Sequence, residues 1–249
     1  MHVFTRSAVI VAALFAPLVA AAQPAPSADE IIARHVTAIG GKDAVLRVKS
    51  IKNSGKLEMP SAGISATIEA ASAPNRSFMR VTIPGIGDIT NGYDGHVAWE
   101  VSPMKGPRIK TDKEKISAQE DADFHGALLF SKERFQSTET LGAADFGGEK
   151  TWQVKAVLRS GKVIHEFFSV ATGLRVGSTS VQESQAGTIR VLTVESHYKQ
   201  FGSIKLATRN EMTTGAQTVV VILTEVVLDG ISADAFELPE PVKALLIKQ

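Results

Sequence analysis

The chain has 249 residues, and its 27 basic and 26 acidic side chains leave a formal net charge of +1. A charge so close to zero argues against nucleic acid or an anionic membrane surface as the main partner. The sequence contains no cysteine, which excludes a disulfide framework, a thiol nucleophile and a thiolate metal site. Stability is therefore expected to come from burial, and the length suffices for one large domain.

The first 22 residues have the features of an export signal. Arg6 gives a short basic segment, residues 8–18 are apolar but too short to cross a bilayer, and Ala20-Ala21-Ala22 fits a cleavage site. No cysteine follows the apolar run, so a lipid anchor cannot be attached there. We expect residues 1–22 to be removed and residues 23–249 to form a single soluble periplasmic domain without a membrane-spanning segment.

Two helices are predicted at the start of the mature chain. Ser27-Ala28-Asp29-Glu30 matches a capping box, in which the serine hydroxyl and the glutamate satisfy each other's backbone amides. Gly40-Gly41 is a typical helix end, and a second short helix is predicted over Asp43 to Val48.

From Ser50 onward, apolar and polar residues alternate in short segments separated by turn residues. This period is typical of half-buried antiparallel strands, apolar on one face and polar on the other. The strand segments before the middle of the chain are Leu57–Met59, Ile64–Ala70, Met79–Ile83 and Val97–Val101, and those after it start at Trp152, Val163, Leu174, Thr188, Ile204 and Thr218. The fold class predicted is α+β, mostly β, with a large antiparallel sheet covered by a few helices.

The middle of the chain has a different pattern. Residues 105–115 are polar and mostly basic, and Pro107 favours a loop. A helix is predicted from Ser117, as its N-cap, to Phe130.

Candidates for chemistry are few. Asp121 and His125 would lie one turn apart on this helix and could form an acid–base pair or share a metal, with Asp123 nearby. No further His or Glu motif completes such a site, so a solvated helix start is the preferred interpretation. No nucleophile elbow or phosphate-binding loop is present. We expect no cofactor, no metal and no enzymatic activity.

The apolar strand face is the remaining candidate. It could be an ordinary core, or it could line a pocket because few helices are available to cover it. Such a pocket would gain about 0.8 kcal/mol for each methylene of a hydrocarbon chain that it removes from water.

One segment has the character of a family motif. Pro74-Asn75 starts a strand, Asp94-Gly95 forms a hairpin, and Trp99 follows in the strand that ends at Pro103. With Phe236 and Pro239 near the end of the chain, this order resembles the periplasmic lipoprotein carriers and the wider family of outer-membrane lipoprotein-sorting proteins. The resemblance implies an unclosed antiparallel half-barrel of about eleven strands, with helices plugging an apolar cavity. It also implies a lipid or lipidated protein as cargo, envelope membrane proteins as further partners, and no catalysis.

The chain departs from the carriers at Ala73, where an arginine that holds the lid helices typically precedes the Pro-Asn pair. A relative that binds another lipid or hydrophobic cargo therefore fits better than a lipoprotein shuttle. The predicted cavity residues are Leu57, Met59, Ile64, Ile68, Met79, Val81, Val97, Trp99, Phe124 and Leu128. Two alternatives stay open: a structural envelope protein with a filled core, and an enzyme using Asp121, Asp123 and His125.

Overall fold

The computed structural model describes residues 25–184 and 187–247, and the predicted export signal lies outside them. The helices are α1 (Ala28–Ala38), α2 (Lys42–Arg47), α3 (Asp112–Ala122), α4 (Phe124–Leu129) and α5 (Glu240–Leu246), with short 3₁₀ helices η1 (Pro60–Ala62), η2 (Lys132–Arg134) and η3 (Ala233–Phe236). The strands are β1 (Ile51–Met59), β2 (Ile64–Ala73), β3 (Arg76–Ile83), β4 (Gly87–Tyr93), β5 (Ala98–Ser102), β6 (Gly106–Lys110), β7 (Phe135–Phe146), β8 (Glu149–Leu158), β9 (Val163–Ser169), β10 (Arg175–Ser184), β11 (Gly187–Phe201), β12 (Ile204–Thr214) and β13 (Gln217–Leu228).

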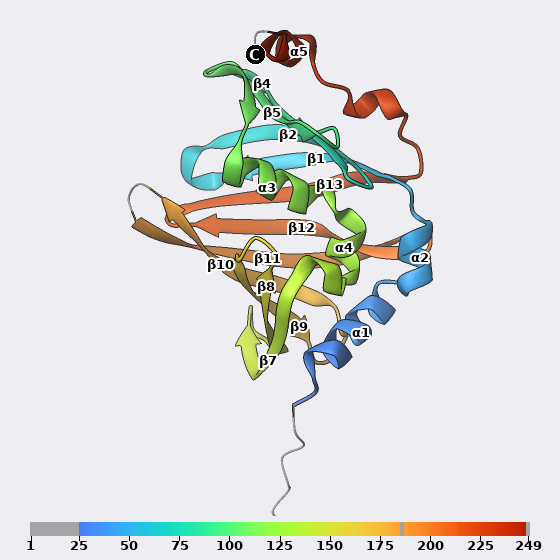
Figure 1. Cartoon of the computed structure of the whole chain (residues 1–249). Coiled ribbons are helices and arrows are strands. Elements are labelled where there is room, and N and C mark those ends of the chain that lie inside the picture. The colour runs from blue at the N-terminus through green and yellow to red at the C-terminus, as the bar shows by residue number, and fades with distance from the viewer. Residues whose placement is uncertain (1–24, 185–186, 248–249) are drawn as a thin grey trace, which may run out of the picture.

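All strands of the described chain belong to one antiparallel sheet. Its order is β6-β5-β4-β3-β2-β1-β13-β12-β11-β10-β9-β8-β7, so β6 and β7 form the two edges although they follow each other in sequence. The chain returns from one edge to the other through α3 and α4, which cross in front of the sheet (Figure 1). The predicted α+β class and the unclosed half-barrel are confirmed, with thirteen described strands rather than about eleven.

The sheet has two distinct faces, which the register defines. Residues paired on neighbouring antiparallel strands point to the same face. Ile68 pairs with Val81 on one face, which we call the inner face. Phe78, Gly92 and Trp99 follow one another across β3, β4 and β5 on the opposite face, which we call the outer face.

Helices α1 to α4 cover the inner face in three places. Ile31 of α1 packs against Val154 and Phe168 of strands β8 and β9. Val45 of α2 and Phe124 of α4 pack in a second cluster, next to the inner-face end of β1. Further along, Ala118 and Ala122 of α3 contact a third cluster over β4 and β5. The helices therefore shield much of the inner face and leave the hairpin ends of β1–β2 and β12–β13 less covered.

The predicted N-terminal helices are confirmed. The Ser27 side chain accepts from the Glu30 amide, and the Ser27 amide donates to Glu30 at 2.7 Å, which completes the capping box. Helix α1 ends at Ala38, and Gly40 and Gly41 both take positive φ just beyond it. The second short helix, α2, ends at Arg47, close to the predicted end.

Two predictions for the middle of the chain are wrong. The predicted loop over 105–115 contains strand β6, and Pro107 is tolerated because β6 is an edge strand. The predicted helix from Ser117 begins earlier, at Asp112, and is divided at Asp123. The Asp123 side chain accepts from the Gly126 amide at 3.0 Å, which starts α4 as a separate helix.

The C-terminal segment packs on the outer face. Residues 230–239 lie over outer-face residues of β1 to β3, among them Phe78, and α5 contacts the edge strand β6. Phe236 and Val242 are buried there. In Figure 1 this red segment runs around the end of the sheet to place α5 beside β4 and β5. An edge that would otherwise expose unpaired backbone is thereby covered.

Candidate functional site

A continuous apolar surface occupies the inner face at the hairpin ends. Leu57, Ile68, Met79 and Val81 pack together with Val221 of β13 in one cluster. Met59 and Ile64 pair with each other at the end of β1–β2 on the same face. Met212 and Val219 pair at the end of β12–β13 on that face too. We call these residues the inner apolar patch: Leu57, Met59, Ile64, Ile68, Met79, Val81, Met212, Val219 and Val221.

The inner apolar patch is not closed to solvent. Only Ile68 and Val81 are buried, at 7% and 8% exposure, whereas Met212 is 44% exposed. The other members are half-buried. An apolar surface left in this state can gain free energy by burying a further apolar group.

Helix α3 lies beside this patch on few apolar contacts. Of its residues, only Ala122 is buried. Its polar contacts to the sheet include Gln119 with the Tyr93 hydroxyl at 3.0 Å and Glu114 with Arg108 at 2.7 Å. Arg134 holds the α3–α4 junction, because its Nη1 lies 2.8 Å from the Glu120 carbonyl and 3.1 Å from the Asp123 carbonyl.

The predicted cavity residues divide into three groups. Six of them, from β1 to β3, belong to the inner apolar patch. Phe124 and Leu128 lie on α4 in the cluster that includes Val45 and Ile204, so they are part of the helix packing beside the patch. The remaining two, Val97 and Trp99, lie before and within β5.

Trp99 does not lie with the patch. It points to the outer face, where it is 1% exposed and its ring centroid is 6.2 Å from that of Phe78. A Cβ at Gly92 would come 3.0 Å from the indole ring, so the ring lies directly over this glycine. Trp99 and Val81 lie on opposite faces of the sheet, so the prediction that one strand face carries both is wrong. On β5 it is Ala98 that faces α3, where it packs with Ala122. Val97 is half-buried just before the strand.

The Asp121–His125 pair is not assembled. Asp121 is an exposed residue in the last turn of α3, which ends at Ala122. His125 belongs to α4, and its Nε2 lies 2.7 Å from the Val48 carbonyl. Among the described residues, no group of three or more His, Asp or Glu side chains could hold a metal ion. The pair that sequence spacing placed on one helix is separated by the break at Asp123.

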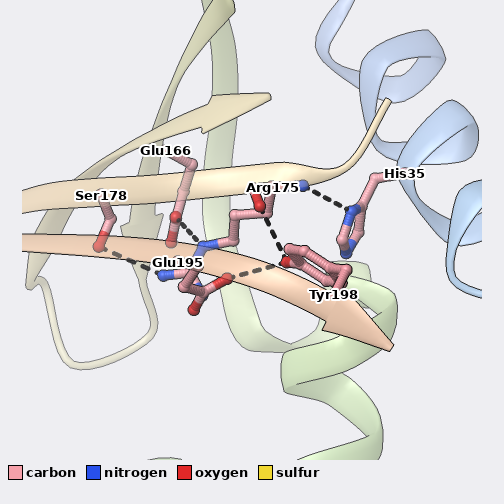
Figure 2. A network of polar contacts seen from close by, with 6 residues as sticks. All are labelled: His35, Glu166, Arg175, Ser178, Glu195 and Tyr198. Carbon is pink, nitrogen blue, oxygen red and sulfur yellow. Dashed lines mark hydrogen bonds and ion pairs between the residues drawn. The ribbon is translucent and has the colours of Figure 1, made fainter. Parts of the chain in front are cut away.

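A second polar constellation lies on the inner face, between α1 and α4, and was not predicted (Figure 2). Arg175 binds Glu166 at 2.6 Å and Glu195 at 2.5 Å. The Tyr198 hydroxyl lies 3.1 Å from Glu195, and the Arg175 amide donates to His35 Nδ1 at 3.2 Å. We call these five residues the Arg175 network.

Burial sets the protonation states of the network. It lowers the pKa of His35 to about 4, with Arg175 adding to the effect, so the imidazole is neutral near pH 7. Burial also raises the pKa of Glu166, against the opposing pull of Arg175. The pKa of Tyr198 is raised by burial and then by Glu195, so its hydroxyl stays protonated. One arginine thus faces two carboxyl groups, and the network carries no excess positive charge.

One sequence signal could have located this network. Ile164, Glu166 and Phe168 alternate on the same strand, so Glu166 is a carboxylate on an apolar face. Such a residue requires a buried partner, but nothing in the sequence identifies Arg175 as that partner.

A groove of about 550 Å³ lies between α1 and residues 129–138. Its lining includes Ile32, Val36 and Phe135. Phe130 is shared with the Arg175 network, because the Arg175 Cζ lies 6.0 Å from the Phe130 ring centroid. The groove is therefore a neighbour of the inner face rather than part of the inner apolar patch.

No family model and no curated protein matches the sequence. Solved structures do share its fold. A LolA-superfamily protein from Nitrosomonas europaea is 14% identical, with a TM-score of 0.57 over 86% of this chain and 99% of that one. A domain from Vibrio parahaemolyticus, named as outer-membrane lipoprotein-sorting, is 12% identical, with a TM-score of 0.55 over 87% and 97% of the two chains. A DUF1329 protein from Desulfovibrio piger is 12% identical, with a TM-score of 0.54 over 84% of this chain and 96% of that one. The chain therefore has a LolA-like fold.

Among the described residues, none of the helices combines the length and apolar character needed to cross a bilayer.

Proposed function

We propose that this protein binds an acyl chain, either of a free lipid or of a lipidated protein, on the inner apolar patch and carries it through the periplasm without chemistry. The observation that carries this proposal is the incomplete cover of the patch, with Met212 44% exposed on the face that α1 to α4 otherwise shield. Removing the chain from water at such a surface contributes about 0.8 kcal/mol for each buried methylene.

The names of the structural neighbours agree with this proposal. One belongs to the LolA superfamily and one is named as a lipoprotein-sorting domain. We further propose that residues 1–22 direct export and that residues 23–249 act as one domain. Since Ala73 stands where the carriers have an arginine, the cargo is proposed to be a lipid rather than specifically an outer-membrane lipoprotein.

The proposal is tested by placing a charge on the patch without disturbing the core. Met212→Asp is suited to this because the side chain is already partly exposed, so folding should tolerate the carboxylate. We expect uptake of a fluorescent fatty acid to weaken by roughly tenfold or more, since a charge placed against the bound chain must be desolvated.

Val227→Asp is the matched control. Val227 is 39% exposed and pairs with Lys52, on the outer face. It should leave uptake unchanged. Equal uptake by both variants and the unsubstituted protein would exclude the inner apolar patch as the site. A protein that takes up no fatty acid at all would favour a structural envelope role instead.

A further inference from the structure

The inner apolar patch and the Arg175 network lie on one continuous row of the sheet. Leu57 of β1 pairs with Val221 of β13, Val221 pairs with Asn210 of β12, and Asn210 pairs with Glu195 of β11. Paired residues share a face, and neighbouring strands are about 4.8 Å apart, so Glu195 lies roughly 14 Å from Leu57 along the row. The inner face thus passes from apolar to polar within the reach of one amphiphilic molecule.

The network is not fully buried. The side chains of Arg175 and Glu195 keep 23% and 14% of their surface exposed, although Glu166 keeps only 7%. Asn210, at the boundary between the two regions, is half-buried, and its side-chain amide makes no hydrogen bond to any described residue. A polar group bound at this boundary would therefore find unused donors and acceptors.

The charge of this region selects among headgroups. Arg175 is the one cation of the network, and it is already shared between Glu166 and Glu195. A phosphate or carboxylate placed here would meet two carboxyl groups for one guanidinium. A hydroxyl can instead accept from the Asn210 amide and donate to Glu195, because it does both at once.

We propose that Glu195, Arg175 and Asn210 form a headgroup subsite that accepts an uncharged, hydroxyl-bearing amphiphile and disfavours an anionic one. This inference rests on the proposed function, since it assumes that the acyl chain lies on the inner apolar patch. It assigns a headgroup class, which the fold and its neighbours leave open.

The test compares two ligands with the same chain, monomyristoylglycerol and myristoyl lysophosphatidate, which differ by the phosphate. Affinities are measured with the mature protein by displacement of an uncharged fluorescent acyl-chain probe, so that the probe does not carry the charge that the subsite disfavours. We expect the neutral ligand to bind at least about tenfold more tightly than the anionic one. A hydrogen bond to a charged group, here from the ligand hydroxyl to Glu195, contributes a ratio of this size.

Glu195→Gln keeps the shape of the side chain while removing the charge. Its amide oxygen can still accept from Arg175, and its NH2 can donate to the Tyr198 hydroxyl, which then donates to the Arg175 carbonyl. It should lower the preference for the neutral ligand severalfold. Glu211→Gln is the control, because Glu211 pairs with Arg209 on the outer face and should not affect the ratio. Asn210→Ala provides an independent readout, with weaker binding of the neutral ligand and little change for the anionic one.

Equal binding of both ligands by the unsubstituted protein would overturn the headgroup subsite and leave the acyl-chain proposal standing. A ratio unchanged by Glu195→Gln would overturn the subsite as well. If neither ligand binds, the proposed function fails together with the subsite.

Discussion

His35 provides the most direct test of the Arg175 network, because its burial makes stability depend on pH. The imidazole is 3% exposed, lies between Phe130 and Phe168 with both ring centroids at 5.4 Å, and accepts from the Arg175 amide. Its folded-state pKa of about 4 lies below the ordinary value of 6.5. Below pH 6.5 the unfolded chain therefore binds a proton that the folded chain does not, and stability falls as the pH falls.

The size of the effect follows from the two pKa values. Integrating the difference in proton binding between pH 7 and pH 5 gives a loss of about 2 kcal/mol from His35 alone. The loss continues to the folded pKa near 4 and then levels off. Urea denaturation at pH 5 and pH 7 measures it as a shift in the midpoint.

His35→Asn is the matched variant, since its side-chain oxygen can occupy the position of Nδ1 and accept from Arg175 without titrating. The variant should be less stable at every pH, because the ring contacts are lost, but its stability should change less between pH 7 and pH 5. An identical pH dependence in both proteins would refute the buried, neutral state of His35.

Two other substitutions test the division between the faces and the attachment of helices α3 and α4. Trp99→Leu should lower the free energy of unfolding by about 3 kcal/mol, because it removes a fully buried ring from the outer face. Fatty-acid uptake by the folded protein should be unchanged. If the folded variant no longer takes up fatty acid, Trp99 contributes to the binding site and the assignment to the outer face is contradicted. Arg134→Met removes the hydrogen bonds to the α3–α4 junction and should weaken it locally by about 1–3 kcal/mol. Hydrogen exchange should then accelerate in residues 112–123 and not in the central strands, whereas uniform acceleration would contradict a local role for Arg134.

Strand and helix periods were enough to predict most of the sheet, because each depends on local alternation, but they did not predict the two edge strands β6 and β7. The capping box at Ser27 gave the start of α1 for the same reason. The break between α3 and α4 escaped prediction since Asp123 could have continued a helix as well as capping one. Asp123 caps α4 here because its side chain accepts from the Gly126 amide and from Arg134, and Arg134 follows later in the chain.

The face of each strand is harder to predict when both faces are covered. In β5, Ala98 packs under α3 while Trp99 packs on the outer face. A prediction that places the larger apolar side chain on the inner face is therefore wrong for this strand. In β1 to β3 the outer face is largely polar, and alternation alone placed Ile68 and Val81 together. The Arg175 network combines residues from α1 and three strands, and only tertiary structure brings them into contact.

The central claim is that the inner face holds an exchangeable acyl chain. Mass spectrometry of the mature protein, purified from its own periplasm without detergent, tests it under native and then denaturing conditions. The account predicts a bound lipid that is present in the native spectrum and released on denaturation. A protein that is empty natively and also fails to take up a fluorescent fatty acid would contradict it.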